Sequence, residues 1–186
     1  MIDVRVHGST ADLHAFVDDG ARSFDALCQS LDGSTPSVVT TDVGRGNLRN
    51  LADLAHLLLD RNVRAWRLRW PARSPEGLAP PRLGLAVPYM LHAAELARRG
   101  GLQTWLAGVP TCGLGPHFAA RLPSPARAFA AACSDCTARA DCCGVPPRYL
   151  EWFGDDLELR RSAEPRPANP LDAALRASWS DDDDRP

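Results

Sequence analysis

The chain has 186 residues, 45% of them hydrophobic, and its formal net charge at pH 7 is −2. This length fits one domain with at most a small addition, and the apolar content is that of an ordinary globular core. The nearly balanced charge provides no basic face for nucleic acid, and no apolar run approaches the ~20 residues that span a bilayer. Because the sequence also starts without a secretory pattern, we expect a cytoplasmic protein with no nucleic-acid or membrane partner.

The first 109 residues alternate strand-like and helix-like patterns. Strands are predicted at residues 2–6, 37–41, 63–70 and 102–109, from β-branched residues and from alternation of apolar with polar side chains. Helices are predicted at residues 23–31, 48–61 and 87–99, with Ser23 and Asn47 as N-caps. This alternation is typical of βαβ units, so the sequence predicts an α/β fold with a parallel sheet.

The loops that follow the predicted strands are where binding groups are expected in such a sheet. They hold His7, residues 42–47, residues 69–73 and Cys112. The first three also have plain structural explanations: His7 lies in a turn, Asn47 caps a helix, and the arginines of residues 69–73 belong to a solvated loop. The sequence leaves both interpretations open.

Five of the six cysteines lie close together, in the order Cys112, Cys133, Cys136, Cys142 and Cys143. Thiolates bind soft metals, and a C-x2-C pair lets two of them face one ion or cluster. Cys142 is near enough in sequence to be a third ligand, and Cys112 can supply a fourth from the body of the fold. One of the adjacent Cys142 and Cys143 is then a spare. The isolated Cys28 is predicted to be a buried apolar residue.

Other interpretations compete for these cysteines. Disulfides need an oxidising compartment, which the expected cytoplasmic location does not offer. A structural zinc site with four cysteines also uses C-x2-C pairs, and spacing alone does not separate zinc from an iron–sulfur cluster.

The end of the chain changes in composition. Residues 123–132 are predicted to be a linker or short helix, and residues 146–153 a helix that begins on prolines and ends at Gly154. The aromatic side chains of that helix, Tyr149, Trp152 and Phe153, are expected to pack over the metal-binding turn. Residues 161–186 are rich in Pro, Arg and Asp and end in DDDDRP, which predicts a disordered acidic tail.

The segments PTCGLGP and CSDCTARADCCGVPPRYLEWFG resemble the C-terminal end of radical S-adenosylmethionine (radical SAM) enzymes that carry a SPASM-like or twitch-like auxiliary cluster region. The matching positions are Cys112, Cys133, Cys136, Cys142, Gly144, Tyr149, Phe153 and Gly154, which leaves Cys143 as the spare. Upstream, VRVHG, His14 and the starts of two helices are similar to the later strands of the radical SAM barrel.

The resemblance implies a partial (half) β/α barrel with parallel strands in residues 1–111 and a small Cys-rich cluster-binding region in residues 112–160, followed by the acidic tail. It implies one auxiliary 4Fe–4S cluster held by Cys112, Cys133, Cys136 and Cys142, with zinc as the alternative. The family's catalytic C-x3-C-x2-C loop has no counterpart in this sequence. We therefore expect this chain alone not to cleave S-adenosylmethionine, a cofactor that would require a partner supplying the N-terminal half.

Three functions stay open. The first is a truncated or split radical SAM-like protein that binds one auxiliary cluster and is related to enzymes modifying peptides or small molecules. The second is a non-catalytic zinc- or cluster-stabilised module that binds a peptide or protein, and the third is a reading frame whose missing half lies upstream. A half-barrel would leave its concave face, expected to carry Val38, Val39, Trp66 and Leu68, partly bare. A separate N-terminal half, self-association with a second copy, or the chain's own tail is expected to cover that face.

Overall fold

The computed structural model describes residues 2–17, 23–33, 37–70, 80–122 and 128–155. Four parallel strands form one sheet in the order β1-β2-β3-β4. Their bounds are β1 (Ile2–Arg5), β2 (Ser37–Asp42), β3 (Val63–Arg69) and β4 (Gln103–Ala107). The predicted α/β class and parallel sheet are therefore confirmed, and each strand lies within one or two residues of its predicted place. The predicted tail, residues 161–186, lies outside the described residues.

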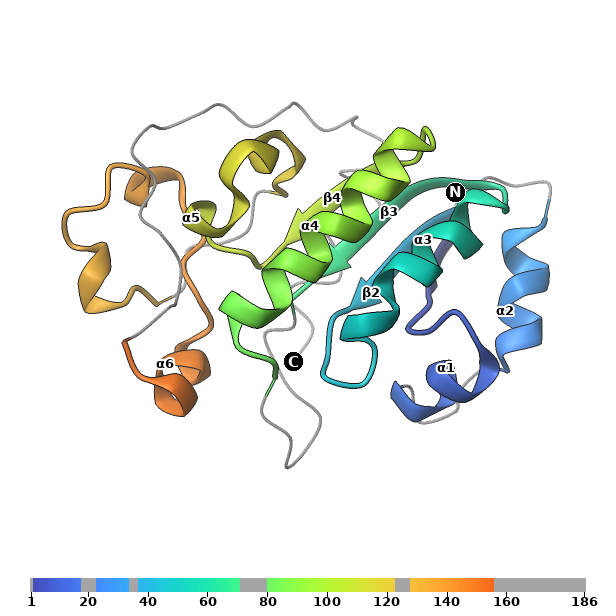
Figure 1. Ribbon diagram of the computed structural model, residues 1–186, viewed down its shortest axis with the longest axis horizontal. Helices are drawn as coiled ribbons and strands as arrows, with labels where there is room; N and C mark the ends of the chain where they lie inside the picture. Colours follow the sequence, from blue (N-terminus) through green and yellow to red (C-terminus); the bar gives the residue numbers. More distant parts are fainter. Residues whose placement is uncertain (1, 18–22, 34–36, 71–79, 123–127, 156–186) are drawn as a thin grey trace.

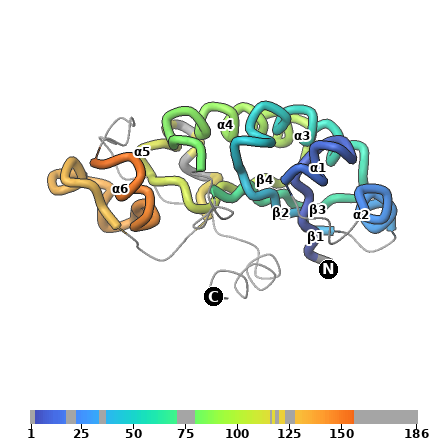
Figure 2. The backbone as a smooth tube through the Cα atoms, turned by 90° about the horizontal axis from the view of Figure 1, so that it is seen from below, coloured from blue at the N-terminus to red at the C-terminus, as the bar shows by residue number. Residues whose placement is uncertain are grey.

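Helices cover one face of this sheet (Figures 1 and 2). The long helices α3 (Leu51–Leu59) and α4 (Leu83–Arg99) lie side by side on that face, while α1 (Ala11–Val17) and α2 (Phe24–Leu31) lie at the β1 side. The shorter elements are η1 (Leu48–Asn50), α5 (Thr111–Leu114), η2 (Gly115–Ala120), η3 (Ala131–Cys133), η4 (Arg139–Asp141) and α6 (Pro147–Phe153). The cysteine-rich part from η3 to α6 lies beyond the carboxyl end of β4, beside the start of α4 (Figure 1).

The main core lies between the sheet and the helices. Its largest fully buried side chains include Trp66, Leu68, Trp70, Leu54, Leu58, Leu83 and Met90. One hydroxyl joins three strands beneath the helices: Thr41 Oγ1 donates to the backbone oxygen of Val6 at 2.6 Å and accepts from Trp66 Nε1 at 2.9 Å. A buried indole N–H is thereby satisfied without water, as a dry core requires.

The prediction for the concave face was wrong at three of its four positions. Val39, Trp66 and Leu68 belong to the core beneath the helices, and Val38 alone belongs to the small apolar cluster on the other side. Side chains alternate between the two faces of a strand, so the neighbouring Val38 and Val39 cannot share one. The register pairs Val39 with Trp66, which places both on the helix side.

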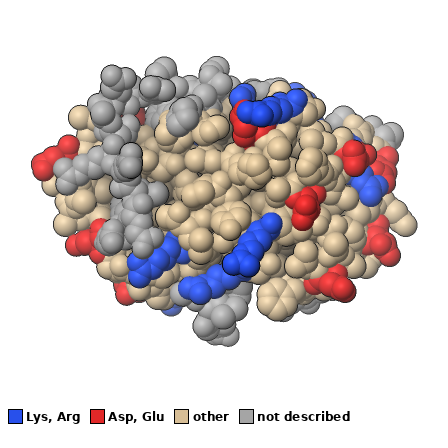
Figure 3. Space-filling view, in the orientation of Figure 1, with Lys and Arg blue, Asp and Glu red and all other residues tan. Residues whose placement is uncertain are grey.

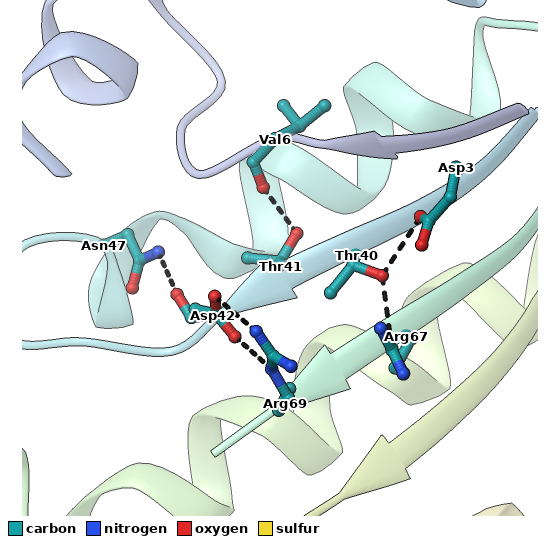
Figure 4. A network of polar contacts seen from close by, with 8 residues as sticks. All are labelled: Asp3, Val6, Thr40, Thr41, Asp42, Asn47, Arg67 and Arg69. Atoms are coloured by element: carbon teal, nitrogen blue, oxygen red, sulfur yellow. Dashed lines mark hydrogen bonds and ion pairs between the residues drawn. The ribbon is translucent and has the colours of Figure 1, made fainter. Parts of the chain in front are cut away.

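The face opposite the helices carries polar side chains on three strands (Figure 4), beside the small apolar cluster that contains Val38. Arg67 Nε donates to Thr40 Oγ1 at 3.2 Å, and that hydroxyl donates to Asp3 Oδ1 at 3.3 Å. Nearer the carboxyl ends, Arg69 holds Asp42 through two hydrogen bonds, Nε to Oδ1 at 2.5 Å and Nη2 to Oδ2 at 3.0 Å. A parallel sheet normally buries apolar side chains on both faces, so this polar face distinguishes the fold from an ordinary layered α/β domain.

One helix start and one helix cap differ from the prediction. Helix α4 begins at Leu83 rather than at residue 87 and continues through Pro88. A proline inside a helix removes one backbone hydrogen bond, but the buried Leu83 and Ala86 anchor the first turn from the core. Asn47 does not cap its helix: its side chain accepts from the N–H of Gly44 and donates to the backbone oxygen of Asp42, both at 2.8 Å. Ser23 is an N-cap as predicted, accepting from the N–H of Ala26.

The surface on the helix side is mostly uncharged, with arginines and acidic residues in small separate groups (Figure 3). Leu85 and Tyr89 of α4 are exposed apolar side chains. Within the described ranges, every helix is too short or too polar to cross a lipid bilayer.

Candidate metal centre

The cysteine-rich segment is wound from consecutive tight turns. The N–H of Cys136 donates to the backbone oxygen of Cys133 at 3.3 Å, which closes the C-x2-C turn. The N–H of Arg139 then donates to the oxygen of Cys136 at 3.1 Å, and that of Cys142 to the oxygen of Arg139 at 3.3 Å. Each turn reverses the chain after three residues, so the three cysteines stay near one another despite the ten-residue span.

A pair of backbone hydrogen bonds ties the two ends of this segment together. Ala128 and Val145 each donate an N–H to the other's backbone oxygen, both at 2.9 Å. Gly144 lies beside this pair with φ +63°, and a Cβ at this position would be only 2.3 Å from the oxygen of Ala128. A glycine is therefore required here both by the left-handed conformation and by the lack of space.

The four cysteines predicted to be ligands line one pocket. Cys112 enters from α5, directly after β4 and Pro110, while Cys133, Cys136 and Cys142 come from the wound segment. Apolar groups form much of the wall, including the ring of Phe129, and the Arg139 guanidinium lies 5.0 Å from the centre of that ring. Residues separated by up to 30 positions in the chain are thus gathered around one space.

The structure separates the adjacent cysteines Cys142 and Cys143. Cys142 lines the pocket, and its Sγ accepts hydrogen bonds from the backbone N–H groups of Thr111 and Gly144, both at 3.4 Å. Cys143 is buried and donates its thiol to the backbone oxygen of Val109 at 3.3 Å, away from the pocket lining. Cys143, predicted to be the spare, therefore does not line the pocket with the other four cysteines.

Two of the pocket thiols, those of Cys112 and Cys133, resist ionisation. Burial, together with the nearby thiols of Cys142, Cys133 and Cys136, raises the pKa of Cys112 to about 12. Burial also raises the pKa of Cys133, and Cys136 and Cys142 act in the same direction. Thiolates gathered at such a place need a compensating positive charge, which a bound metal centre provides.

The possible metal ligands that line the pocket are all cysteine thiols. All six cysteines are free thiols. In the part of the chain that the structure describes, no three histidine, cysteine or acidic side chains are grouped so that they could hold a single metal ion. The four thiols therefore surround the pocket without converging on one point.

In the other loops that were predicted to hold binding groups, the described side chains make structural contacts. The backbone N–H of His7 donates to His14 Nδ1 at 3.2 Å, and the two buried rings stack with centroids 6.0 Å apart. Asn47 organises its loop, and Arg69 pairs with Asp42. Residues 71–73 lie outside the described residues. Cys28 is half-buried in α2, far from the other cysteines in sequence and absent from the pocket lining.

The aromatic side chains of α6 do not line the pocket, contrary to expectation. Tyr149 is buried against Trp70 and Phe153, with ring centroids 5.4 Å and 4.8 Å away, and its hydroxyl accepts from the N–H of Leu83 at 3.1 Å. Trp152 is more than one-third exposed. A buried tyrosine needs a partner for its hydroxyl, and the free N–H at the start of α4 supplies one.

Sequence reasoning missed the backbone donors of Thr111 and Gly144 and the place of Arg139 at the pocket. Backbone N–H groups carry no signal in the sequence, although the arginine within the C-x5-C interval could have been noted. Comparisons of this chain with protein-family models, with curated proteins and with solved structures find no match.

Proposed function

We propose that this protein binds one 4Fe–4S cluster through Cys112, Cys133, Cys136 and Cys142. The observation that carries the proposal is the gathering of these four thiols, and not the thiol of Cys143, around one pocket. A 4Fe–4S cluster attaches its four thiolates to different iron atoms, whereas zinc draws four sulfurs to about 2.3 Å from a single point. Thiols spread around a pocket support the first arrangement.

The bound cluster would supply a one-electron redox centre. Four cysteine ligands leave no iron open to a substrate, which favours electron transfer or a structural role over direct binding of substrate to iron. The chain's own residues supply the thiolates, hold Cys142 through the Thr111 and Gly144 amides, and exclude water with an apolar wall.

The wider proposal is a radical SAM-like protein with a partial β/α barrel. The four-stranded parallel sheet and the polar face opposite its helices support it, because the inside of an incomplete barrel that receives a ligand can be polar. The partner would be a separate N-terminal half or a second copy, and the substrate a peptide or small molecule. S-adenosylmethionine would enter only with a partner that holds the catalytic cluster.

A zinc-stabilised interaction module is the second candidate. The compact C-x2-C turn, with its 3.3 Å hydrogen bond between Cys136 and Cys133, is a geometry that structural zinc sites also use. Such a module would bind a peptide or protein without chemistry.

Anaerobic reconstitution tests the proposal and separates the two candidates. Purified protein is supplied with ferrous iron and sulfide under argon, or with zinc in parallel, and is then desalted. We expect iron and labile sulfide at about four each per chain, with absorbance from thiolate-to-iron charge transfer. Stoichiometric zinc with no retained sulfide in the iron sample would instead establish the zinc site.

Matched cysteine variants test the ligand set. Cys136→Ser should lose the cluster because it removes a thiolate from the pocket. Cys143→Ser should keep it, since that thiol donates to the Val109 oxygen and does not line the pocket. The reverse pattern would show that the wrong member of the adjacent pair was chosen.

A further inference from the structure

We propose that the backbone N–H groups of Thr111 and Gly144 raise the reduction potential of a cluster bound in the pocket, by hydrogen bonding to the thiolate of Cys142. This inference rests on the proposed cluster and adds a regulatory property to it. The two backbone amides would thus set the reduction potential, and the amide of Thr111 is the one that a substitution can remove.

The two donors approach Cys142 from different parts of the chain. Thr111 begins α5, four positions after the end of β4 and 31 positions before Cys142, and Gly144 follows two positions after Cys142. Both N–H groups lie 3.4 Å from the same sulfur. A sulfur that receives donors from two separate segments is held by the tertiary fold, not by its local turn alone.

Neither donor can easily turn away. Gly144 is fixed in the left-handed conformation against the oxygen of Ala128, within the backbone pair that closes the segment. Thr111 is the first residue of α5, whose opening turn places its N–H outward where no helical acceptor exists. Donors that are fixed before a charge develops stabilise it without the cost of reorganisation.

The expected effect follows from charge. Reduction adds one electron to the cluster and increases the negative charge on its thiolate ligands, with no bond formed or broken. Hydrogen bonds to a ligand sulfur stabilise the more negative state, so they raise the potential, and the effect is larger in apolar surroundings. The Arg139 guanidinium at the same pocket acts in the same direction.

Thr111→Pro removes one of the donors with little other change. Proline is tolerated at the first position of a helix, where its missing N–H costs no helical bond. The preceding Pro110 has ψ 144°, an extended conformation that suits a residue before proline. The matched control is Thr111→Ala, which keeps the N–H but removes the hydroxyl that accepts from Arg121 Nη1 at 3.3 Å.

The measurement is a potentiometric titration of the reconstituted proteins with dithionite, followed by EPR of the reduced cluster. Thr111→Pro should have a lower midpoint potential than wild type at equal iron and sulfide content, and Thr111→Ala should match wild type. Equal potentials in all three loaded proteins would overturn the inference. A drop in both variants would assign the effect to the lost hydroxyl and would overturn it as well.

A second measurement uses wild-type protein alone, in case Thr111→Pro does not load. ENDOR of the reduced cluster in protein labelled with 15N-threonine or 15N-glycine should show coupling to an amide of each type, with protons that exchange in deuterium oxide. Absence of these couplings would overturn the inference while leaving the cluster itself established. Failure of wild type to retain iron and sulfide would refute the proposed function, a distinct outcome read from the metal analysis.

Discussion

Thr41 shows how one residue joins three strands of the sheet. Its hydroxyl donates to the oxygen of Val6, just past the end of β1, and accepts from the Trp66 indole of β3, all within the buried core. Both partners are shielded from water by the helices above them. Removal of the hydroxyl therefore leaves two buried polar groups without that partner, which is costlier than loss of an exposed hydrogen bond.

Thr41→Val is the direct test, because valine has nearly the shape of threonine but no hydroxyl. We expect the free energy of unfolding to fall by about 2–3 kcal/mol, measured by urea denaturation. Thr41→Ser keeps the hydroxyl and should lose much less. Equal losses in the two variants would show that the hydroxyl contributes no more to stability than the methyl group at this position.

At the residue scale, the sequence could predict some features of the candidate site but not others. Cys112, Cys133, Cys136 and Cys142 could be selected from spacing and resemblance, because thiols as ligands depend on residue type. The donors to Cys142 could not, since any residue except proline carries a backbone N–H. Gly144 lies between these two cases. The motif match included it, but only the nearby backbone oxygen of Ala128 shows why a glycine is needed there.

At the scale of elements, β2 and β3 are joined by side chains as well as by their ladder. Asp42 and Arg69 occupy paired positions in the register and form the two-bond ion pair on the polar face. Burial alone would raise the pKa of Asp42. The hydrogen bond and positive charge of Arg69 outweigh it, so the pKa is lowered below its usual 3.8. The pair consequently favours the folded state when Asp42 is ionised.

The sign of this shift predicts how Asp42→Asn depends on pH. A carboxyl with a lowered pKa stabilises the fold above its unfolded pKa and loses that contribution as the pH falls through the folded value. We expect Asp42→Asn to cost about 2 kcal/mol from pH 8 to about pH 5, and less below about pH 4. Urea denaturation across this pH range measures it.

Glu95 offers the control for this prediction. It also pairs with arginines, Arg98 and Arg99, and the hydrogen bond from Arg99 lowers its pKa, but it lies on the exposed surface of α4. Surface pairs contribute little because water and salt screen them. Glu95→Gln should therefore change stability far less than Asp42→Asn, and a comparable loss would contradict the role given to the sheet pair.

Element boundaries show why strands were easier to predict than helix starts. The alternation in residues 63–70 is preserved in the strand, where Arg67 and Arg69 lie on one face and Trp66 and Leu68 on the other. The start of α4 depends instead on Tyr149, distant in sequence, which accepts from the first N–H of the helix. A contact across 66 positions leaves no local pattern to recognise.

At the scale of the whole molecule, β1 is the terminal strand of the sheet in the part of the chain that the structure describes. β1 pairs with β2 alone among the described strands and is four residues long, and its Asp3 and Arg5 are exposed. Because the N–H of Val6 points inward to Thr40, alternation directs the N–H of Arg5 to the outer edge. The outer edge of a terminal strand is a template for a strand from another chain.

We expect the isolated protein to self-associate reversibly at micromolar concentrations, as measured by sedimentation velocity over a concentration series. A monomer at every concentration, with one cooperative melting transition, would show that the edge of β1 does not recruit a second chain.

The hydrogen bond between Tyr149 and Leu83 has a consequence for the protein in a cell. It joins the segment that carries three of the pocket cysteines to the first turn of the longest helix. Any metal centre that binds the folded pocket but not the unfolded chain adds its binding free energy to the stability of both parts. With the proposed cluster as that metal centre, iron supply would determine how long the polypeptide survives proteolysis. The amount of this protein in the cell would then rise and fall with the available iron.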